Sequence, residues 1–325
     1  MSRRNAVLLV TDDNLLPPAL HLWFRLRAMN AREDTDVLLV LPDEAVSKVP
    51  GSGLPGLIPI SNLPMPAIPY AGPSHVTEAA CLRIVAPRYL QSDYAKILYL
   101  DIDVLVSDGS LLRVFDQELT TPLAATRWHK KSFDPNMVVD GKVREGAFEF
   151  RRYFNSGVLV IDVDRYVASD IDGKALSFLA QEQGRSETPD QTALNVAVGE
   201  DWQELSPAMN FRAELLPTFL SERFPPIVIH YVGEQKSWQT PSFDHPLRSE
   251  QLRWLARNGH GRFLLKNLRP KRMIQAIGKR ISGKTAYRPP YIAPQNPLIR
   301  DYLATDFVDH WNVRPAEAAA PSGTI

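Results

Sequence analysis

The stretch from Tyr94 to Val106, YAKILYLDIDVLV, constrains the fold of this chain more than any other. It is largely apolar, and two aspartates, Asp101 and Asp103, stand two positions apart near its end. An apolar run of this kind predicts a buried strand, which we place from Tyr94 to Asp103. Side chains two positions apart in a strand point to the same side, so the carboxylates are expected on one face, with Ile102 packed opposite.

The paired carboxylates favour a bound divalent cation. Two carboxylates this close repel each other unless a cation neutralises them. In open α/β sheets, ligands bind outside the carboxyl ends of the strands, where this pair is expected. The triplet alone is not specific, because Asp-x-Asp occurs four times, beginning at Asp34, Asp101, Asp162 and Asp170. The apolar strand before Asp101 distinguishes it from the other three.

The first 250 residues predict an α/β fold, because short apolar runs alternate with helical patterns. Seven prolines between Pro50 and Pro73 predict a loop, since such spacing excludes a long helix or a central strand. Ser74 is expected to cap a helix that runs to Ala86, with Pro87 bending or ending it. Further strands are expected over Asn5–Thr11, Asp36–Leu41, Pro122–Thr126, Phe154–Ile161 and Ile227–Tyr231, and further helices over Leu15–Met29, Ala175–Gln183 and Asp190–Val198.

Composition indicates a globular chain outside the membrane core. Of its 325 residues, 44% are hydrophobic, which suffices for a large core. The one cysteine, Cys81, cannot form an internal disulfide, so nothing requires an oxidising compartment and the cytoplasm is expected. The first apolar run stops at Thr11, too early for a signal peptide, and no run is long enough to predict a membrane-spanning helix.

A basic segment follows the α/β pattern. The formal net charge is zero, yet residues 251–300 contain 12 Lys and Arg and no Asp or Glu. From Arg253 to Arg288, apolar and cationic residues mix at near-helical spacing, which is typical of a segment that contacts an anionic membrane surface. A solvated or intersubunit basic face and nucleic-acid binding are the alternatives, and we expect no nucleic-acid partner. We therefore predict a catalytic domain at 1–250, a basic, partly helical segment at 251–300 and a partly disordered tail at 301–325.

Two families of enzymes are compatible with the aspartate pair. Haloacid-dehalogenase-type phosphohydrolases also place Asp-x-Asp after an apolar strand, with the first carboxylate as nucleophile. In that family the motif follows the first strand of the domain, whereas here 100 residues of α/β pattern precede Asp101. Other motifs must decide between the families.

Four such motifs occur in order along the chain. They are VTDDN at Val10–Asn14, FNSGVLVIDVDRY at Phe154–Tyr166, PDQTALN at Pro189–Asn195 and HYVGEQKSW at His230–Trp238. Together with KILYLDIDVLV they resemble the retaining glycosyltransferases of family 8, and are similar to bacterial lipooligosaccharide galactosyltransferases and glycogenin. The resemblance implies a GT-A fold, which is a Rossmann-like mixed sheet flanked by helices, a uridine diphosphate (UDP) hexose donor and manganese.

The resemblance also implies a metal and leaving-group site. Asp101, Asp103 and His230 match the family's metal ligands, and with diphosphate oxygens this donor set suits Mn²⁺ or Mg²⁺ better than Zn²⁺. Gly233 permits close approach of the backbone to a phosphate. Lys236 is a point charge for the departing diphosphate, which would stabilise the transition state.

Further residues match donor-binding positions. Asp12 and Asn14 match residues that hold the uracil and ribose, and the resemblance favours this role over the alternative, an ordinary Asx turn. Asp190 and Gln191 match positions close to the anomeric carbon, and Asp190 is also a suitable helix N-cap. Because an amide is a poor nucleophile, we expect same-face substitution with Gln191 as a positioning group. The remaining expected donor-binding residues are Thr11, Arg83, Ile102, Asn155 and Ser156.

The expected function is metal-dependent transfer of a hexose, galactose or glucose, from a UDP-sugar to a saccharide or glycolipid acceptor. The resemblance places this reaction in lipopolysaccharide or surface polysaccharide synthesis, at the inner face of the membrane. A phosphohydrolase and a non-catalytic nucleotide-sugar-binding module are the alternatives.

Overall fold

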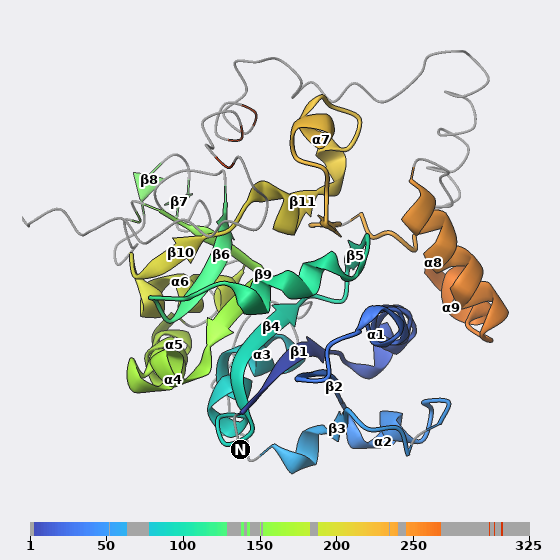
Figure 1. Cartoon of the computed structure of the whole chain (residues 1–325), viewed down its shortest axis with the longest axis horizontal. Coiled ribbons are helices and arrows are strands. Elements are labelled where there is room, and N and C mark those ends of the chain that lie inside the picture. Colours follow the sequence, from blue (N-terminus) through green and yellow to red (C-terminus); the bar gives the residue numbers. More distant parts are fainter. Residues whose placement is uncertain are drawn as a thin grey trace, which may run out of the picture.

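The structure is a computed structural model of the chain (Figure 1). It describes residues 3–51, 53–63, 78–128, 138–139, 142–143, 150, 152–182, 188–233, 235–239 and 245–267, together with Ile299, Tyr302 and Phe307. The predicted Ser74 cap and most of the basic segment and tail lie outside these residues.

Seven strands form the central sheet, in the order β10-β6-β9-β4-β1-β2-β3 (Figure 1). β9 runs antiparallel to both of its neighbours, β4 and β6, whereas the other pairs are parallel. The start of β9 therefore lies beside the end of β4, with Val158 opposite Leu100. The strands are β1 Arg4–Val10, β2 Thr35–Leu41, β3 Leu57–Pro59, β4 Tyr94–Leu100, β6 Leu123–Arg127, β9 Phe154–Asp162 and β10 Trp202–Glu204.

A second, three-stranded sheet continues from the end of β4. Its order is β11-β12-β5, with β5 at Val104–Val106, β11 at Phe211–Arg212 and β12 at Val228–His230. β12 is antiparallel to β5, and His230 pairs with Val104. The second sheet thus brings the end of β12 next to the residues that follow β4. A separate two-stranded ladder joins β7, Val138–Val139, to β8, Lys142–Val143.

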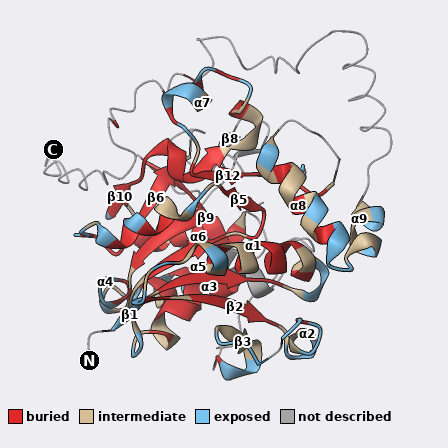
Figure 2. Cartoon of the chain, turned by 45° about the vertical axis from the view of Figure 1, so that its right-hand side comes forward, coloured by how far each residue is buried: buried red, intermediate tan, exposed pale blue. Residues whose placement is uncertain are grey.

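Helices cover both faces of the central sheet, and two apolar cores result. Alternate residues of β1 face opposite sides, since Val7 and Leu9 join one core and Ala6 and Leu8 the other. Figure 2 shows the strands buried and the exposed residues on the outer sides of the helices. The first core lies under α1 Leu16–Met29 and η3 Gly109–Asp116, and the second under α3 Glu78–Tyr89, α4 Val163–Ala168, α5 Ile171–Glu182 and α6 Pro189–Val198.

Short helices complete the described chain. They are η1 Asp13–Leu15, α2 Asp43–Val46, η2 Ile60–Asn62, η5 Pro207–Asn210, η6 Ala213–Leu215, α7 Leu220–Arg223, α8 Pro246–Arg257 and α9 Gly261–Asn267. None of the helices in this described part combines the length and apolar character that crossing a bilayer requires.

The predicted elements are largely confirmed, with three differences. The strand predicted over Tyr94–Asp103 ends at Leu100, because the chain turns before entering the second sheet. The proline-rich loop contains an edge strand, β3, which pairs with β2 alone and ends in Pro59. An edge strand tolerates proline because one of its sides forms no ladder. Pro87 does not end α3, which continues to Tyr89.

The described residues after position 250 include side chains that pack on the body of the protein. α8 begins at Pro246, and its Trp254 ring lies 6.0 Å from the Phe24 ring of α1. Tyr302 is buried, and its ring meets the edges of Phe211 and Phe224 at 5.9 and 6.2 Å. The division at residues 250 and 300 remains a prediction, but these contacts tie both later segments to the first core.

His21 links α1 to α8 and carries a perturbed pKa. The buried imidazole lies edge-on to the Trp254 ring, 5.4 Å between ring centroids. Burial, with a smaller effect of Arg25, lowers the pKa of His21 from 6.5 to about 4. The folded protein therefore keeps this histidine neutral under conditions in which the unfolded chain binds a proton.

We expect this histidine to make the protein less stable in acid. Above the unfolded pKa of 6.5, His21 is neutral in both states and the free energy of unfolding is at its full value. As the pH falls toward the folded pKa of about 4, only the unfolded chain binds the proton, so the free energy of unfolding decreases. The loss amounts to at most about 3 kcal/mol. Urea unfolding at pH 7 and pH 4.5 should show a smaller acid loss for His21→Leu than for the wild type. Equal losses in the two proteins would rule His21 out as the cause.

Candidate functional site

Asp101 and Asp103 lie in the turn that joins β4 to β5, not in a strand. The turn is held on both sides, because Asp101 N–H donates to the Gly157 carbonyl and Tyr231 N–H donates to the Asp103 carbonyl, at 2.8 and 3.1 Å. Ile102, between the two aspartates, packs into the first core as predicted. A turn, and not the predicted strand alternation, therefore brings the two carboxylates together.

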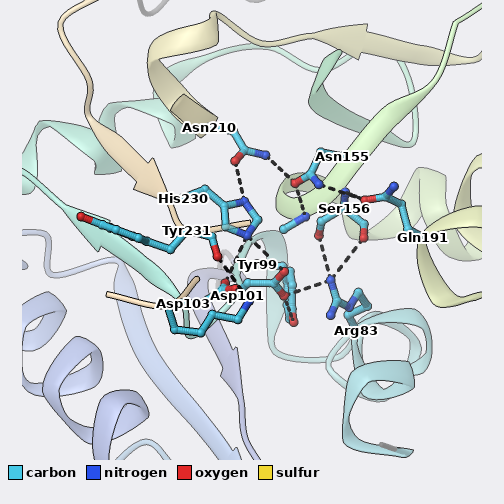
Figure 3. Close-up of polar contacts among 12 residues, drawn as sticks. Arg83, Tyr99, Asp101, Asp103, Asn155, Ser156, Gln191, Asn210, His230 and Tyr231 are labelled. Carbon is cyan, nitrogen blue, oxygen red and sulfur yellow. Dashed lines mark hydrogen bonds and ion pairs between the residues drawn. The ribbon is translucent and has the colours of Figure 1, made fainter. Parts of the chain in front are cut away.

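His230 reaches this turn from the end of β12 (Figure 3). Its Nε2 lies 3.1 Å from Asp103 Oδ1 and 3.9 Å from Asp101 Oδ2. One ligand atom from each of the three side chains lies within 4.8 Å of the others. The structure thus brings together the three predicted metal ligands from two different sheets.

These three residues fit a divalent cation. Two carboxylates and one imidazole form a mixed oxygen and nitrogen donor set, which suits Mn²⁺ or Mg²⁺ together with diphosphate oxygens. Asp103 Oδ1 is buried and has no hydrogen-bond partner among the described residues. A buried carboxylate oxygen in that position is costly unless a cation or donor reaches it.

Each aspartate has its own cationic neighbour. Lys236 Nζ forms an ion pair with Asp103 Oδ2 and donates to the Tyr231 carbonyl at 3.2 Å. Burial alone would raise the pKa of Asp103, but the His230 imidazole and the Lys236 ammonium beside it outweigh burial and hold that pKa below its usual range. Asp103 is consequently a carboxylate at neutral pH.

Arg83 of α3 forms ion pairs with two acids, and Figure 3 shows its contacts with Asp101 and Ser156. Its Nη1 lies 2.9 Å from Asp101 Oδ1, and its Nε lies 3.3 Å from Asp190 Oδ2. Nη1 also donates to the Ser156 carbonyl and hydroxyl at 3.1 and 3.2 Å. Burial raises the pKa of Asp190, and Arg83 opposes that rise.

Gln191 is held in place by its surroundings. Its Oε1 accepts from Asn155 Nδ2 at 3.0 Å and from Ser156 N–H at 3.1 Å. Its Nε2 donates to the Tyr153 hydroxyl at 3.3 Å. Both ends of the amide are thus engaged by β9 and its preceding residue. Asp190 and Gln191 lie in the first turn of α6, where Thr188, and not Asp190, is the N-cap.

Gly157 leaves the space that the cluster occupies. A Cβ atom at this position would lie 2.3 Å from His230 Cε1 and 2.8 Å from Asp101 Oδ2. No side chain fits there while both ligands keep their places. The FNSG motif therefore contributes polar groups, and its glycine leaves room for His230 and Asp101.

The other predicted donor-binding residues lie apart from this network. Thr11 Oγ1 donates to the Asp12 carbonyl, and the Asp12 carboxylate accepts from Leu15 N–H and caps η1. Asn14, in η1, is exposed. Gly233 is an exposed residue with a φ of 80°, a backbone conformation that favours glycine.

Sequence reasoning missed three residues that support the site. Tyr99 donates its hydroxyl to Asp101 Oδ1 at 2.8 Å, and Tyr153 supports Gln191. Asn210 Oδ1 lies 2.8 Å from His230 Nδ1. Tyr99 lies two positions before Asp101, a spacing that could have identified it. Asn210 sits in the short 3-10 helix η5, where no periodic pattern marks it.

Comparisons with known proteins agree with this arrangement. The family model described as Glycosyl transferase family 8 matches residues 69–241, more than half of the chain. General stress protein A of Bacillus subtilis is 26% identical over 202 residues, 56% of this chain and 66% of that protein. Lipopolysaccharide glucosyltransferase WaaO of Escherichia coli is 24% identical over 186 residues, 53% of this chain and 52% of that protein. The chain thus spans between half and two thirds of these two relatives.

Solved structures show the same fold. Galactosyltransferase LgtC in complex with donor and acceptor sugar analogs superimposes with a TM-score of 0.54 at 21% identity, covering 78% of this chain and 95% of that chain. An active-site mutant of LgtC gives a TM-score of 0.56 at 20% identity, with the same coverage. The predicted GT-A fold is confirmed, and the family match contradicts the phosphohydrolase alternative. The chain belongs to glycosyl transferase family 8.

Proposed function

We propose that this protein is a metal-dependent retaining glycosyltransferase that moves a hexose, galactose or glucose, from a UDP-sugar to a saccharide or glycolipid acceptor. The observation that carries the proposal is the convergence of Asp101, Asp103 and His230, whose ligand atoms lie within 4.8 Å of one another. These residues come from two separate motifs of a glycosyltransferase family match. We assign them to Mn²⁺ or Mg²⁺.

A cation at this position would neutralise charge on the donor diphosphate as the sugar leaves. Lys236, beside Asp103, is placed to hold the β-phosphate once the diphosphate arrives. The exposed Gly233 lets the neighbouring backbone approach the same group. Charge on the departing diphosphate grows in the transition state, so these contacts lower the barrier more than they tighten substrate binding.

The residues around Gln191 fit a same-face substitution. A glutamine whose Oε1 already accepts two hydrogen bonds is a poor nucleophile, and its position is fixed by Asn155 and Ser156. We therefore assign Gln191 to positioning the donor sugar. Asp190 binds sugar hydroxyls in this scheme, with Arg83 balancing its charge. Trapping a glycosyl adduct on Gln191 or a nearby carboxylate would overturn this assignment.

The residues after β1 are assigned to the nucleoside. Thr11, Asp12 and Asn14 follow a strand adjacent to β4, at the same edge of the parallel part of the sheet as the aspartates. The Asp12 carboxylate caps η1 through one oxygen, Oδ1. Its other oxygen can therefore accept a hydrogen bond from a ribose or base.

The acceptor is assigned by analogy with relatives. The name of WaaO describes a lipopolysaccharide glucosyltransferase, and the LgtC structure contains donor and acceptor sugar analogs. A role in lipopolysaccharide or surface polysaccharide synthesis, in the cytoplasm at the inner face of the membrane, follows for this chain as a proposal. A non-catalytic nucleotide-sugar-binding module is the remaining alternative.

The described helices after residue 245 support a membrane contact. We define the α8–α9 basic face as the exposed cations Arg253, Arg257, Arg262 and Lys266. Leu265 lies next to them and is 70% exposed. Between Gln251 and Asn267 the sequence contains no Asp or Glu. This combination of cations and an exposed apolar side chain suits an anionic lipid surface.

The enzymatic proposal is tested by donor hydrolysis. We expect the protein with Mn²⁺ to release UDP slowly from UDP-galactose or UDP-glucose, and Asp103→Asn to reduce release more than about 100-fold. Asp116→Asn is the matched control, because this exposed carboxylate is ion-paired with Arg32. Donor binding without release in the wild type would support the binding module instead.

The space at Gly157 gives a second test. Gly157→Ala should displace His230 and Asp101 and weaken Mn²⁺ binding by roughly 10- to 100-fold in titration calorimetry. Gly261→Ala is the control, because nothing lies within 4 Å of its added Cβ. Circular dichroism should show both variants folded. Unchanged Mn²⁺ affinity in Gly157→Ala would argue against the assigned ligands.

Membrane contact is tested with lipid vesicles. Changing the four cations of the α8–α9 basic face to Gln should weaken binding to phosphatidylserine vesicles by about 100-fold or more at low salt, since each cation near such a surface contributes about 1 kcal/mol. Undiminished binding would remove this face from the proposal. The control changes four exposed cations elsewhere to Gln, namely Lys48, Arg113, Arg165 and Lys174.

A further inference from the structure

We propose that Asn210 is a positioning residue that keeps a proton on His230 Nδ1 and so reserves His230 Nε2 for the cation. The inference rests on the proposed role of His230 as a metal ligand. It assigns a function to a residue that lies outside the aspartate pair and the histidine motif. A chain of hydrogen bonds that begins at the main chain of β9 leads to this assignment.

Two main-chain N–H groups fix the orientation of the first amide in this chain. Gly157 N–H donates to one end of the Asn155 side chain at 3.0 Å, so that end must be the oxygen, Oδ1. The other end, Nδ2, donates to Gln191 Oε1 at 3.0 Å. Ser156 N–H donates to the same Gln191 oxygen at 3.1 Å, which agrees with this orientation.

The orientation of the Asn210 amide follows from that of the Asn155 amide. Asn210 approaches Asn155 Oδ1 at 2.8 Å, and an acceptor can be approached closely only by a donor, so this end of Asn210 is Nδ2. Asn210 Oδ1 then faces His230 Nδ1 at 2.8 Å (Figure 3). Because Oδ1 is an acceptor, His230 Nδ1 must carry a proton.

The consequence lies on the opposite side of the ring. With its proton on Nδ1, a neutral imidazole has its lone pair on Nε2. Nε2 is the atom that lies 3.1 Å from Asp103 Oδ1 and 3.9 Å from Asp101 Oδ2. In the other tautomer, two acceptors would face each other at 2.8 Å inside the protein, since Asn210 and His230 are both buried. Asn210 therefore favours the metal-binding tautomer.

The backbone around Asn210 holds its side chain next to His230. Asn210 is the last residue of η5, and the next two residues form β11, which pairs with β12 so that Arg212 lies opposite His230. η5 is itself tied to the segment before β12, because Ile227 N–H donates to the Ala208 carbonyl at 2.9 Å. Asn210 thus immediately precedes the strand that pairs with the strand of His230.

The test compares two substitutions of Asn210 by Mn²⁺ affinity, measured by electron paramagnetic resonance without any sugar donor. Asn210→Leu removes the acceptor and should weaken Mn²⁺ binding by roughly 10- to 100-fold. Asn210→Asp keeps an acceptor for His230 but cannot donate to Asn155, and should stay within about threefold of the wild type. Asn195→Leu is the control for loss of a buried asparagine, because Asn195 bonds to Phe154 and Gln191 and not to His230.

A second readout requires neither metal nor activity. Long-range proton–nitrogen correlation spectra of the metal-free protein should show His230 protonated at Nδ1 in the wild type, in Asn210→Asp and in Asn195→Leu. Asn210→Leu should lose this preference. The His230 signal is identified by its absence in His230→Gln.

Three results would overturn the inference. They are unchanged Mn²⁺ affinity and tautomer in Asn210→Leu, equal losses in Asn210→Leu and Asn210→Asp, and a wild-type protein that binds no Mn²⁺. A wild-type protein that binds Mn²⁺ but releases no UDP would instead reject the proposed transferase, and the comparison of variants would still decide the role of Asn210.

Discussion

The main chain at Gly157 is the point on which the candidate site depends. Its carbonyl accepts from Asp101 N–H, and its N–H donates to the Asn155 side chain. The first bond fixes the turn that bears the aspartates, and the second orients the amides around Gln191. The first bond exists because β9 runs antiparallel to β4 and pairs with its end, whereas the second bond closes within β9 itself. One reversed strand in an otherwise parallel region therefore aligns the site.

Charge balance is the second constraint on the site. Asp103 and Asp190 are buried, and burial disfavours an unpaired carboxylate. Lys236 pairs with Asp103, and Arg83 is shared between Asp101 and Asp190. The cationic neighbours of Asp103 keep this buried carboxylate ionised, so it is available to an incoming cation with little rearrangement of the fold.

Sequence patterns predicted the elements and the charged residues of the site well, for a physical reason. Buried strands need long apolar runs, so polar residues at their ends stand out, as Asp101 and His230 do. The apolar run from Tyr94 could not show that the chain turns after Leu100, because apolar residues resume in β5 directly after the two aspartates. The prediction that strand alternation pairs the aspartates was wrong, because a turn brings them together.

Neutral supporting residues were harder to predict. Asn210 ends a short 3-10 helix with no apolar period, and its importance comes only from the pairing of the next strand, β11, with β12, which brings it to His230. Gly157 was visible as a glycine in FNSG, but the two side chains that exclude a Cβ there come from other strands. Contacts of this kind depend on tertiary structure, which a single sequence does not encode in any local pattern.

The pairing of β12 with β5 has a consequence for how the protein folds. Contacts between residues far apart in a chain form late, because the loop between them must close first. His230 and Asp103 come from opposite ends of such a long loop, whereas Asp101 and Asp103 are neighbours. During synthesis, both aspartates leave the ribosome long before their histidine and lysine partners. The nascent chain therefore carries the acidic part of the site alone, and a cation that reaches it early meets only two of the three proposed protein ligands.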